Sequence, residues 1–307
     1  MRRRAIRASL TEFARACGFE PAPHHCLLID RLERLVRGEY RRLFVWMPPG
    51  SAKSTFASVL FPAWYLAQQG AGAVIAASHA VSLAERFSRK VRNLVTEHEA
   101  ELGYRLAGDS QAAGRWETNR GQEYYAAGVG TGIAGFRASL GIIDDPVASR
   151  EAADSEVSRE SVWAWYNDDF SNRLIPGALE VVIQTRWHEA DLSGRLIERG
   201  DSIAQHVLSL PAIAGQDDPL GREPGEWLWE GEYGYADRLR EKKETSDPRS
   251  WAAMFQQNPV PDEGLFLDVG QIQRVKPPPL EEMRLFAASD YATSDGSGDW
   301  TVHIVGG

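Results

Sequence analysis

The chain has 307 residues, of which 25% are charged and 43% are hydrophobic, and its formal net charge is −9. This composition is typical of a globular protein with room for one large or two moderate domains. No apolar run approaches the roughly 20 residues that span a bilayer, so no membrane association is expected. The acidic balance excludes a surface coated in basic residues, although a local basic patch can still bind nucleic acid.

The N-terminal stretch MRRRAIRASL is basic, and no apolar signal core follows it. We interpret it as a solvated basic leader, and a tail that touches DNA is the alternative. Cys17 and Cys26 are too few for a disulfide framework and lack zinc-ligand neighbours, which suits a reducing cytoplasm.

Helix and strand patterns alternate through the first two thirds of the chain. Apolar residues at helical spacing predict an amphipathic helix over 27–42. Further helices are predicted over 53–67 and 82–99, and short apolar runs predict buried strands over 43–47, 72–79, 140–145 and 178–185. Strands that alternate with helices indicate the α/β class, with a mostly parallel central sheet flanked by helices.

After Leu210 the composition shifts to Pro, Gly and acidic residues, which predicts a loop-rich subdomain or linker. The turn-rich segment FQQNPVPDEGLF then leads to a predicted strand in RLFAASDYA, a loop, and a final strand in WTVHIVGG. Two strands alone form only a marginally stable hairpin, so we expect this segment to be the truncated start of a second domain.

A phosphate-binding loop is the first candidate site. Residues 42–66 place a strand, a short loop and a helix in the required order. Lys53 and Ser54 stand where the pattern G-x-x-x-x-G-K-[ST] needs them, whereas Met47 and Ala52 replace its two glycines. The extra methyl group of Ala52 costs little only at negative φ, so we expect a negative φ there.

The chemistry of this loop follows from its residue types. The Lys53 ammonium would reach the β- and γ-phosphates, and the Ser54 hydroxyl would ligate Mg²⁺. Backbone amides at the positive end of the following helix would bind phosphate. The alternative is a helix N-terminus capped by Ser51, with an exposed lysine. The predicted nucleotide-binding residues are Pro49, Gly50, Ser51, Ala52, Lys53, Ser54 and Thr55.

Two acids end the apolar run SLGIIDDP. Ligands of open α/β sheets bind at the carboxyl ends of the strands, which is where Asp144 and Asp145 would stand. One carboxylate there can hold Mg²⁺ through water, and its neighbour can orient the water that attacks a γ-phosphate. The alternative is a polar strand-to-turn transition closed by Pro146.

Two further segments offer candidate residues. Arg137 lies near the end of the glycine-rich GVGTGIAGFRA, and a guanidinium at the active edge could stabilise transition-state charge. A surface arginine is the alternative there. Thr185, Arg186 and His188 follow the fourth buried strand, where a polar residue can sense the γ-phosphate. A simple helix entry at HEADLSGRL is the alternative for that segment.

Five motifs, taken together and in this order, resemble the large subunit of the tailed-bacteriophage terminase and its prophage and gene-transfer-agent relatives. They are MPPGSAKST, GIIDDP, PGALEVVIQTRWHEADLSGRL, FQQNPVPDEG and SDYATSDGSGDWT, and the resemblance runs from about Arg42 to the end of the chain. It implies a P-loop NTPase fold, followed by a linker subdomain and the opening strands of an RNase H-like nuclease domain. The implied parts are a helical lead-in over 1–40, an ATPase domain over 41–210, a linker subdomain over 211–265 and an incomplete nuclease over 266–307.

The resemblance also implies a function. ATP hydrolysis with Mg²⁺ would drive double-stranded DNA into a procapsid, and the nuclease would cut the DNA with two divalent metal ions, Mg²⁺ or Mn²⁺. The implied partners are DNA, the portal protein and procapsid, and the small terminase subunit, with the motor forming a ring of subunits in the host bacterial cytoplasm. A two-metal site needs several converging carboxylates, and the later ones are missing here, so we expect little or no nuclease activity.

The resemblance assigns roles to the residues of the phosphate site. Lys53 and Ser54 would bind phosphate and Mg²⁺, and Asp144 would be the metal-associated acid. Asp145 would be the catalytic carboxylate, although the family more often has Glu at this position. Glu151 is the fallback for that role.

The resemblance assigns three further roles. Arg137 would be an arginine finger that acts on a neighbouring subunit. Thr185 and Arg186 would couple hydrolysis to movement. Asp290 would be the first metal-binding acid of the nuclease, and two acids lie close behind it, Asp295 and Asp299.

Two alternatives stay open at this point. The first is another P-loop enzyme, a DNA-dependent ATPase or helicase that separates strands. The second is an inactive prophage remnant that binds DNA or procapsid without hydrolysis. Measuring ATP turnover with and without DNA separates all three.

Overall fold

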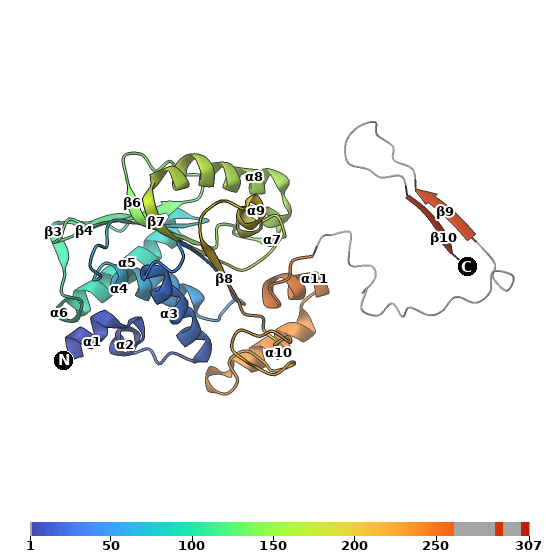
Figure 1. Cartoon of the computed structure of the whole chain (residues 1–307), viewed down its shortest axis with the longest axis horizontal. Coiled ribbons are helices and arrows are strands. Elements are labelled where there is room, and N and C mark those ends of the chain that lie inside the picture. Colours follow the sequence, from blue (N-terminus) through green and yellow to red (C-terminus); the bar gives the residue numbers. More distant parts are fainter. Residues whose placement is uncertain (1, 261–285, 291–301, 307) are drawn as a thin grey trace. The chain divides into compact units, whose positions relative to one another are not determined.

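The computed structural model describes residues 2–260, 286–290 and 302–306. The chain divides into two compact units, Met1–Asp262 and Glu263–Gly307. All the candidate residues of the phosphate site belong to the first unit, which Figure 1 shows coloured along the sequence. The division into four functional parts stays a prediction.

An eight-stranded sheet forms the centre of the first unit, in the order β3-β4-β5-β2-β6-β7-β1-β8 (Figure 1). The strands from β5 to β8 in this order pair in parallel, and β3 and β4 add an antiparallel edge. The strands are β1 (Arg42–Trp46), β2 (Val74–Ser78), β3 (Leu106–Gln111), β4 (Arg115–Thr118), β5 (Glu123–Gly128), β6 (Ala138–Asp144), β7 (Leu174–Gln184) and β8 (Gln205–Ser209). The prediction of a mostly parallel sheet flanked by helices is confirmed.

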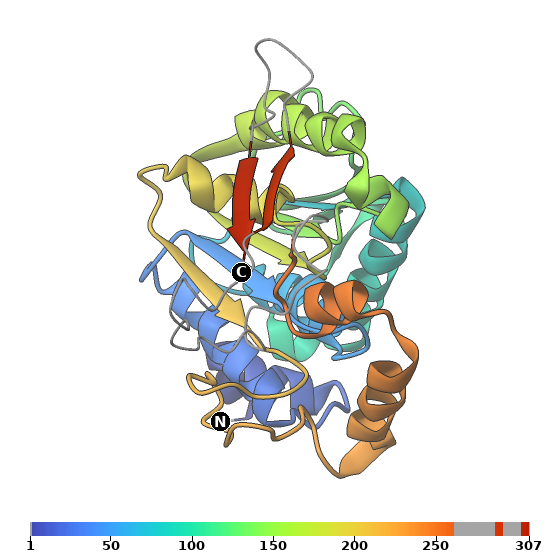
Figure 2. The ribbon, with the colours of Figure 1, turned by 90° about the vertical axis from the view of Figure 1, so that its right-hand side faces the viewer.

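Helices cover both faces of this sheet (Figures 1 and 2). Side chains of β1 alternate between the faces, because successive strand residues point in opposite directions. Leu43 and Val45 join the core with helices α2 to α5, whereas Phe44 joins the core with α8 and α9. These helices are α2 (Leu10–Ala16), α3 (Pro23–Val36), α4 (Phe61–Tyr65), α5 (Val81–Glu97), α8 (Glu156–Trp165) and α9 (Leu192–Arg199).

The helix after the phosphate loop differs from the regular helix predicted over 53–67. Its first part is a π-helix, η1 (Thr55–Leu60), and α4 follows without a break. The amide of Phe61 donates to Phe56 O, five residues earlier, directly before Pro62. Pro62 has no N–H for Ser58 O and its ring would crowd that carbonyl in an α-helix, so the wider turn accommodates it.

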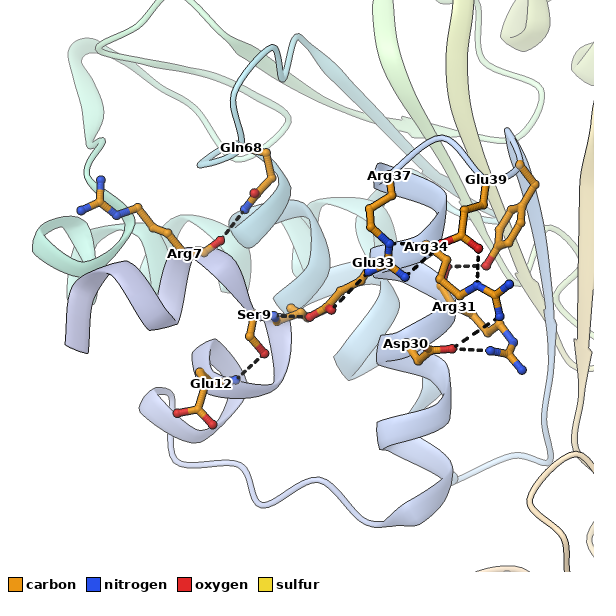
Figure 3. A network of polar contacts seen from close by, with 12 residues as sticks. Arg7, Ser9, Glu12, Asp30, Arg31, Glu33, Arg34, Arg37, Glu39 and Gln68 are labelled. Atoms are coloured by element: carbon orange, nitrogen blue, oxygen red, sulfur yellow. Dashed lines mark hydrogen bonds and ion pairs between the residues drawn. The ribbon is translucent and has the colours of Figure 1, made fainter. Parts of the chain in front are cut away.

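The N-terminal residues are helical and attached to the body of the unit, which differs from the solvated leader we expected. Ile6 of α1 (Arg2–Ala8) is buried in the core. Gln68 Nε2 donates to Arg7 O at 3.0 Å, and the amide of Leu10 donates to Glu33 Oε1 at 2.7 Å (Figure 3). The basic stretch therefore packs as part of the fold through its apolar residues.

The segment after β8 folds around its own small core. It contains η4 (Glu232–Gly234), α10 (Tyr235–Thr245), α11 (Pro248–Ser250) and η5 (Trp251–Phe255). Leu228, Leu239 and Phe255 are buried together with Tyr235 of α10. The sequence predicted the loops of this segment but not its helices.

The second unit contains an antiparallel pair, β9 (Phe286–Asp290) and β10 (Val302–Gly306), at the two places where strands were predicted. Asp295 and Asp299 lie outside the described residues. The remaining short elements of the first unit are α6 (Glu99–Leu102), α7 (Arg150–Asp154), η2 (Tyr166–Phe170) and η3 (Ser171–Arg173). Across the described parts of the chain, no helix combines the length and the apolar character needed to cross a membrane.

Candidate functional site

The candidate residues gather at the carboxyl edge of the parallel strands. The phosphate loop follows β1, Asp144 closes β6, and Thr185 follows β7, which lies between β1 and β6. Chain segments that leave neighbouring parallel strands meet at one edge of a sheet, so residues distant in sequence come into contact there.

The phosphate loop begins with a tight turn. The Ser51 amide donates to Pro48 O at 3.3 Å, and Gly50 has φ +82°. Proline at the second position and a positive φ at the third fit a type II turn, which favours glycine there. Pro49 and Gly50 thus give the loop its shape.

Ala52 contradicts the expected negative φ, because its φ is +62°. An L-residue with a side chain costs roughly 1–2 kcal/mol in this left-handed region, which is why the usual pattern has glycine at this position. The expectation considered only the methyl group beside a phosphate and overlooked the backbone path. The loop turns here whether or not the residue is glycine, so Ala52 is strained.

Two distant segments hold the carbonyl groups of the loop. Tyr235 Oη in α10 donates to Pro49 O at 2.9 Å, and a Cβ at Gly50 would lie 3.3 Å from the Tyr235 ring. His25 Nδ1 accepts from the Ala22 amide, so its Nε2 carries the proton and donates to Ser51 O at 3.0 Å. The loop is therefore fixed from α3 and from α10.

A second histidine of α3 reaches the same carbonyl group. His24 Nε2 lies 3.3 Å from Ser51 O. Burial lowers the pKa of His24 to about 3 and that of His25 to about 4, so both rings are neutral at pH 7. The indole of Trp229 contacts both rings, at centroid distances of 4.8 and 4.9 Å. The segment before α10 thus supports α3 where α3 supports the loop.

Lys53 points into the site. Its side chain is buried, and Nζ donates to Thr185 Oγ1 at 2.9 Å. Ser51 Oγ is buried and has no hydrogen-bond partner among the described residues, so it does not cap the helix. The alternative of a Ser51-capped helix with an exposed lysine is wrong.

Asp144 accepts hydrogen bonds from two serines of the helix after the loop. Ser54 Oγ lies 3.1 Å from Oδ1, and Ser58 Oγ lies 2.5 Å from Oδ2. Asp144 is only 2% exposed, and this burial, together with the charge of Asp145, raises its pKa to about 7 against the pull of both serines and Lys53. A buried acid with a raised pKa is one that a bound cation would return to its charged form.

These oxygen atoms fit Mg²⁺ as the resemblance implies. Ser54 Oγ and Asp144 Oδ1 are adjacent hard donors, and Mg²⁺ in nucleotide sites takes one or two protein oxygens together with phosphate and water. Within the described parts of the chain no group of three or more His, Cys, Asp or Glu could hold a metal. A metal here would therefore depend on the nucleotide for its remaining ligands.

Asp145 has an unusual backbone and a fixed carboxylate. Its φ is +46° although Pro146 follows it, and a residue before proline favours extended conformations. The Thr185 amide donates to Asp145 Oδ1 at 2.8 Å. Thr185 therefore contacts both the lysine and the second acid, through its side chain and its backbone.

A cavity of about 10 Å³ adjoins Asp145 and Thr185. Gln184, the last residue of β7, lines it, and Gln184 Oε1 is buried without a partner among the described residues. A space of this size holds about one water molecule. The cavity therefore offers room for a water beside the second acid.

Arg186 faces away from the phosphate loop and forms a structural link. Its Nε donates to Asp191 Oδ2 at 2.5 Å, and its guanidinium lies 4.2 Å from the centre of the Trp46 ring. Asp191 also caps α9 by accepting from the Gly194 amide at 2.9 Å. Arg186 thereby joins the exits of β7 and β1 to α9, which begins at Leu192 rather than at the predicted residue 188.

Three predicted residues stand apart from this cluster. Arg137 is exposed, and its Nη1 donates to Asn172 O at 3.4 Å. Glu151 is exposed in the first turn of α7. Asp290 ends β9 in the second unit. The structure brings none of the three into contact with Asp144 or Lys53 among the described residues, and their roles stay predictions.

Sequence reasoning missed several residues that shape the site. Ser58 follows Ser54 by four residues, and that helical spacing was a readable signal. His79 follows the buried strand β2 as a polar residue at the carboxyl edge, which was also readable. Tyr235 carries no local signal, because its contact with Pro49 spans 186 residues.

Comparisons with known proteins give likenesses of fold. No family model matches the chain, and no curated protein matches it. The structure is similar to the large terminase of bacteriophage HK97, at 12% identity and a TM-score of 0.45. It is also similar to the large terminase of a thermophilic bacteriophage, at 14% and 0.48, and to a mutant ATPase domain of the Thermus phage P74-26 large terminase, at 11% and 0.46.

The shares covered differ among these structures. The match with HK97 covers 71% of this chain and 46% of that one, and the match with the thermophilic-phage enzyme covers 85% and 60%. The match with the P74-26 domain covers 75% and 93%. The chain thus spans about half the length of the first two proteins and nearly all of an isolated ATPase domain.

Proposed function

We propose that this chain is the ATPase part of a DNA-packaging motor of the large-terminase type. One observation carries the proposal: Lys53 and Ser54 of the loop converge with Asp144 and Thr185 at the carboxyl edge of a parallel sheet. ATP is the proposed substrate, and the large terminase of the thermophilic bacteriophage was solved in complex with its analogue ATP-gamma-S. The motifs after the loop favour DNA packaging over other uses of ATP.

The residues of the site suggest how hydrolysis would proceed. Lys53 would leave Thr185 Oγ1 and pair with the β- and γ-phosphates. Ser54 and Asp144 would hold Mg²⁺, which when bound offsets phosphate charge. Asp145 adjoins a cavity with room for one water and would orient the attacking water, with Glu151 as the alternative. Thr185 would pass the loss of Lys53 to β7.

The remaining elements of the proposal concern partners. The exposed Arg137 would stabilise transition-state charge in a neighbouring subunit of a ring. Arg186 would carry movement of the β7 exit to α9 through its bond with Asp191. Double-stranded DNA, a portal or procapsid, and a small terminase subunit are the proposed partners. Asp290 would belong to a nuclease that needs further acids.

Ala52 supports a second candidate function. Its positive φ places strain at the position where the loop must follow the phosphates. A remnant that binds DNA or procapsid without hydrolysing ATP would retain such a residue without penalty.

One experiment separates the candidates. ATP turnover is measured in Mg²⁺ with and without linear double-stranded DNA, and strand separation is measured on forked DNA. A packaging ATPase hydrolyses ATP, responds to duplex DNA and leaves the fork intact. Strand separation would show a helicase, and no turnover by folded protein would favour the remnant.

A further inference from the structure

The backbone at Asp145 requires an explanation that the phosphate loop does not supply. Its φ is +46°, in the left-handed region, and Pro146 follows it. A non-glycine residue rarely adopts this conformation, and it persists only where surrounding contacts enforce it. Such contacts at an active-site acid are candidates for a role in catalysis.

Hydrogen bonds hold Asp145 from both neighbouring strands. From the β7 side, its amide donates to Ile183 O at 2.8 Å, and its Oδ1 accepts from the Thr185 amide at 2.8 Å. From the β2 side, its carbonyl oxygen accepts from the His79 amide at 3.2 Å. The same oxygen lies 3.1 Å from His79 Nδ1.

The chemistry of the acceptor fixes the state of the imidazole. A carbonyl oxygen cannot donate, so the short contact is a hydrogen bond only if Nδ1 carries a proton. The strand register supports the contact, because Ser78 of β2 pairs with Asp144 of β6. His79 therefore lies beside Asp145, one residue beyond the ladder, and the chain leads from it into α5.

We propose that His79 is a positioning residue for ATP hydrolysis, whose Nδ1–H holds the Asp145 backbone so that its carboxylate faces Thr185. The proposal rests on the proposed function and names a further residue of the same site. His79 has no contact with the phosphate loop among the hydrogen bonds of the described residues. Its removal should therefore alter turnover more than nucleotide binding.

Three substitutions test the donor. His79→Asn places an amide N–H near the position of Nδ1, His79→Gln places it near Nε2, and His79→Ala removes it. We expect kcat for ATP to fall about tenfold in the Ala and Gln variants, as for other outer-shell partners of active-site groups, and to recover in the Asn variant. KM for ATP should stay near that of the parent protein in all three.

A nuclear magnetic resonance measurement tests the donor independently of turnover. In ¹⁵N-labelled nucleotide-free protein, the ring signals of His79 are assigned by their loss in His79→Asn. A neutral ring protonated at Nδ1 is expected, and a ring protonated only at Nε2 would overturn the inference even if the protein hydrolyses no ATP. Equal kcat in the Asn, Gln and Ala variants would also overturn it, whereas a parent protein without turnover but with the Nδ1–H ring would refute only the proposed function.

Discussion

Lys53 Nζ donates to Thr185 Oγ1 across a distance of 2.9 Å, which joins the phosphate loop to the end of the neighbouring strand β7. The Thr185 amide also donates to Asp145 Oδ1 at 2.8 Å. A single residue therefore contacts both the proposed phosphate ligand and the proposed catalytic acid. When phosphate takes Lys53 away, Thr185 loses one of its two contacts, which is a direct route from nucleotide to sheet.

Thr185→Val should destabilise the nucleotide-free protein. The substitution keeps the shape but leaves the buried Lys53 ammonium without its acceptor, which costs about 1–3 kcal/mol. Denaturant unfolding without nucleotide measures the change. Thr185→Ser keeps the hydroxyl and should unfold near the parent midpoint, so equal stability of the Val and Ser variants would contradict the role of this bond.

Ala52→Gly should stabilise the protein. Glycine relieves roughly 1–2 kcal/mol of left-handed strain and gives back roughly 0.5–1 kcal/mol in chain entropy, so a net gain of about 0.5–1 kcal/mol is expected. The matched control is Ala57→Gly in η1, which should lose about 1 kcal/mol or more. Thermal unfolding compares the two, and a loss in both would show that the loop at residue 52 is not strained.

Asp144 should make stability depend on pH. Burial raises its pKa from 3.8 to about 7, so the folded protein keeps a proton that the unfolded chain releases. The stabilisation is full below about pH 4 and is lost as the pH rises to about 7. Asp144→Asn removes this slope, so the difference in unfolding free energy between the two proteins should change over that range.

The comparison with Asp144→Asn also removes an opposing effect. The lowered pKa values of His24 and His25 make the unfolded chain bind more protons below about pH 6.5, so their contribution rises with pH. Both proteins share this effect, and it cancels in the difference. A difference that stays constant from pH 4 to pH 7 would show that Asp144 titrates normally.

Tyr235→Phe should loosen the phosphate loop. The variant keeps the ring against Gly50 but removes the donor to Pro49 O, which costs about 1 kcal/mol and should raise KM for ATP. Tyr233→Phe is the matched control, because Tyr233 is 77% exposed. If the two variants bind ATP alike, α10 has no part in shaping the loop.

Plasmid cleavage tests the nuclease expectation. We expect little or no cutting by this chain in Mn²⁺, because a two-metal site needs more carboxylates than follow Asp290 here. Agarose gels of supercoiled plasmid give the measurement. Specific cleavage that Asp290→Ala abolishes would overturn the expectation.

Periodicity and apolar runs predicted the buried parallel strands well, because strands covered on both faces are continuously apolar. The edge strands escaped for the same reason. In β8 only Leu208 is buried, and β4 has four residues that alternate with exposed ones. Edge strands are recognised by their pairing partners, which a single sequence does not reveal.

The site divides in a similar way. The strand-loop-helix order and the paired acids were local patterns, so Lys53, Asp144 and Thr185 could be expected at one edge. The backbone of Ala52 was misjudged, because its φ depends on the turn that Pro49 and Gly50 impose. Contacts such as that of Tyr235 with the loop depend on tertiary packing and leave no trace in the local sequence.

The central claim is that the residues at this sheet edge hydrolyse ATP. Its most direct test is steady-state ATP hydrolysis in Mg²⁺ by the full chain, by Lys53→Ala, and by Lys242→Ala as a control at an exposed lysine of α10. We predict a loss of about 100-fold or more for Lys53→Ala and an unchanged rate for Lys242→Ala. A Lys53→Ala variant that hydrolyses ATP as fast as the parent protein would contradict the claim.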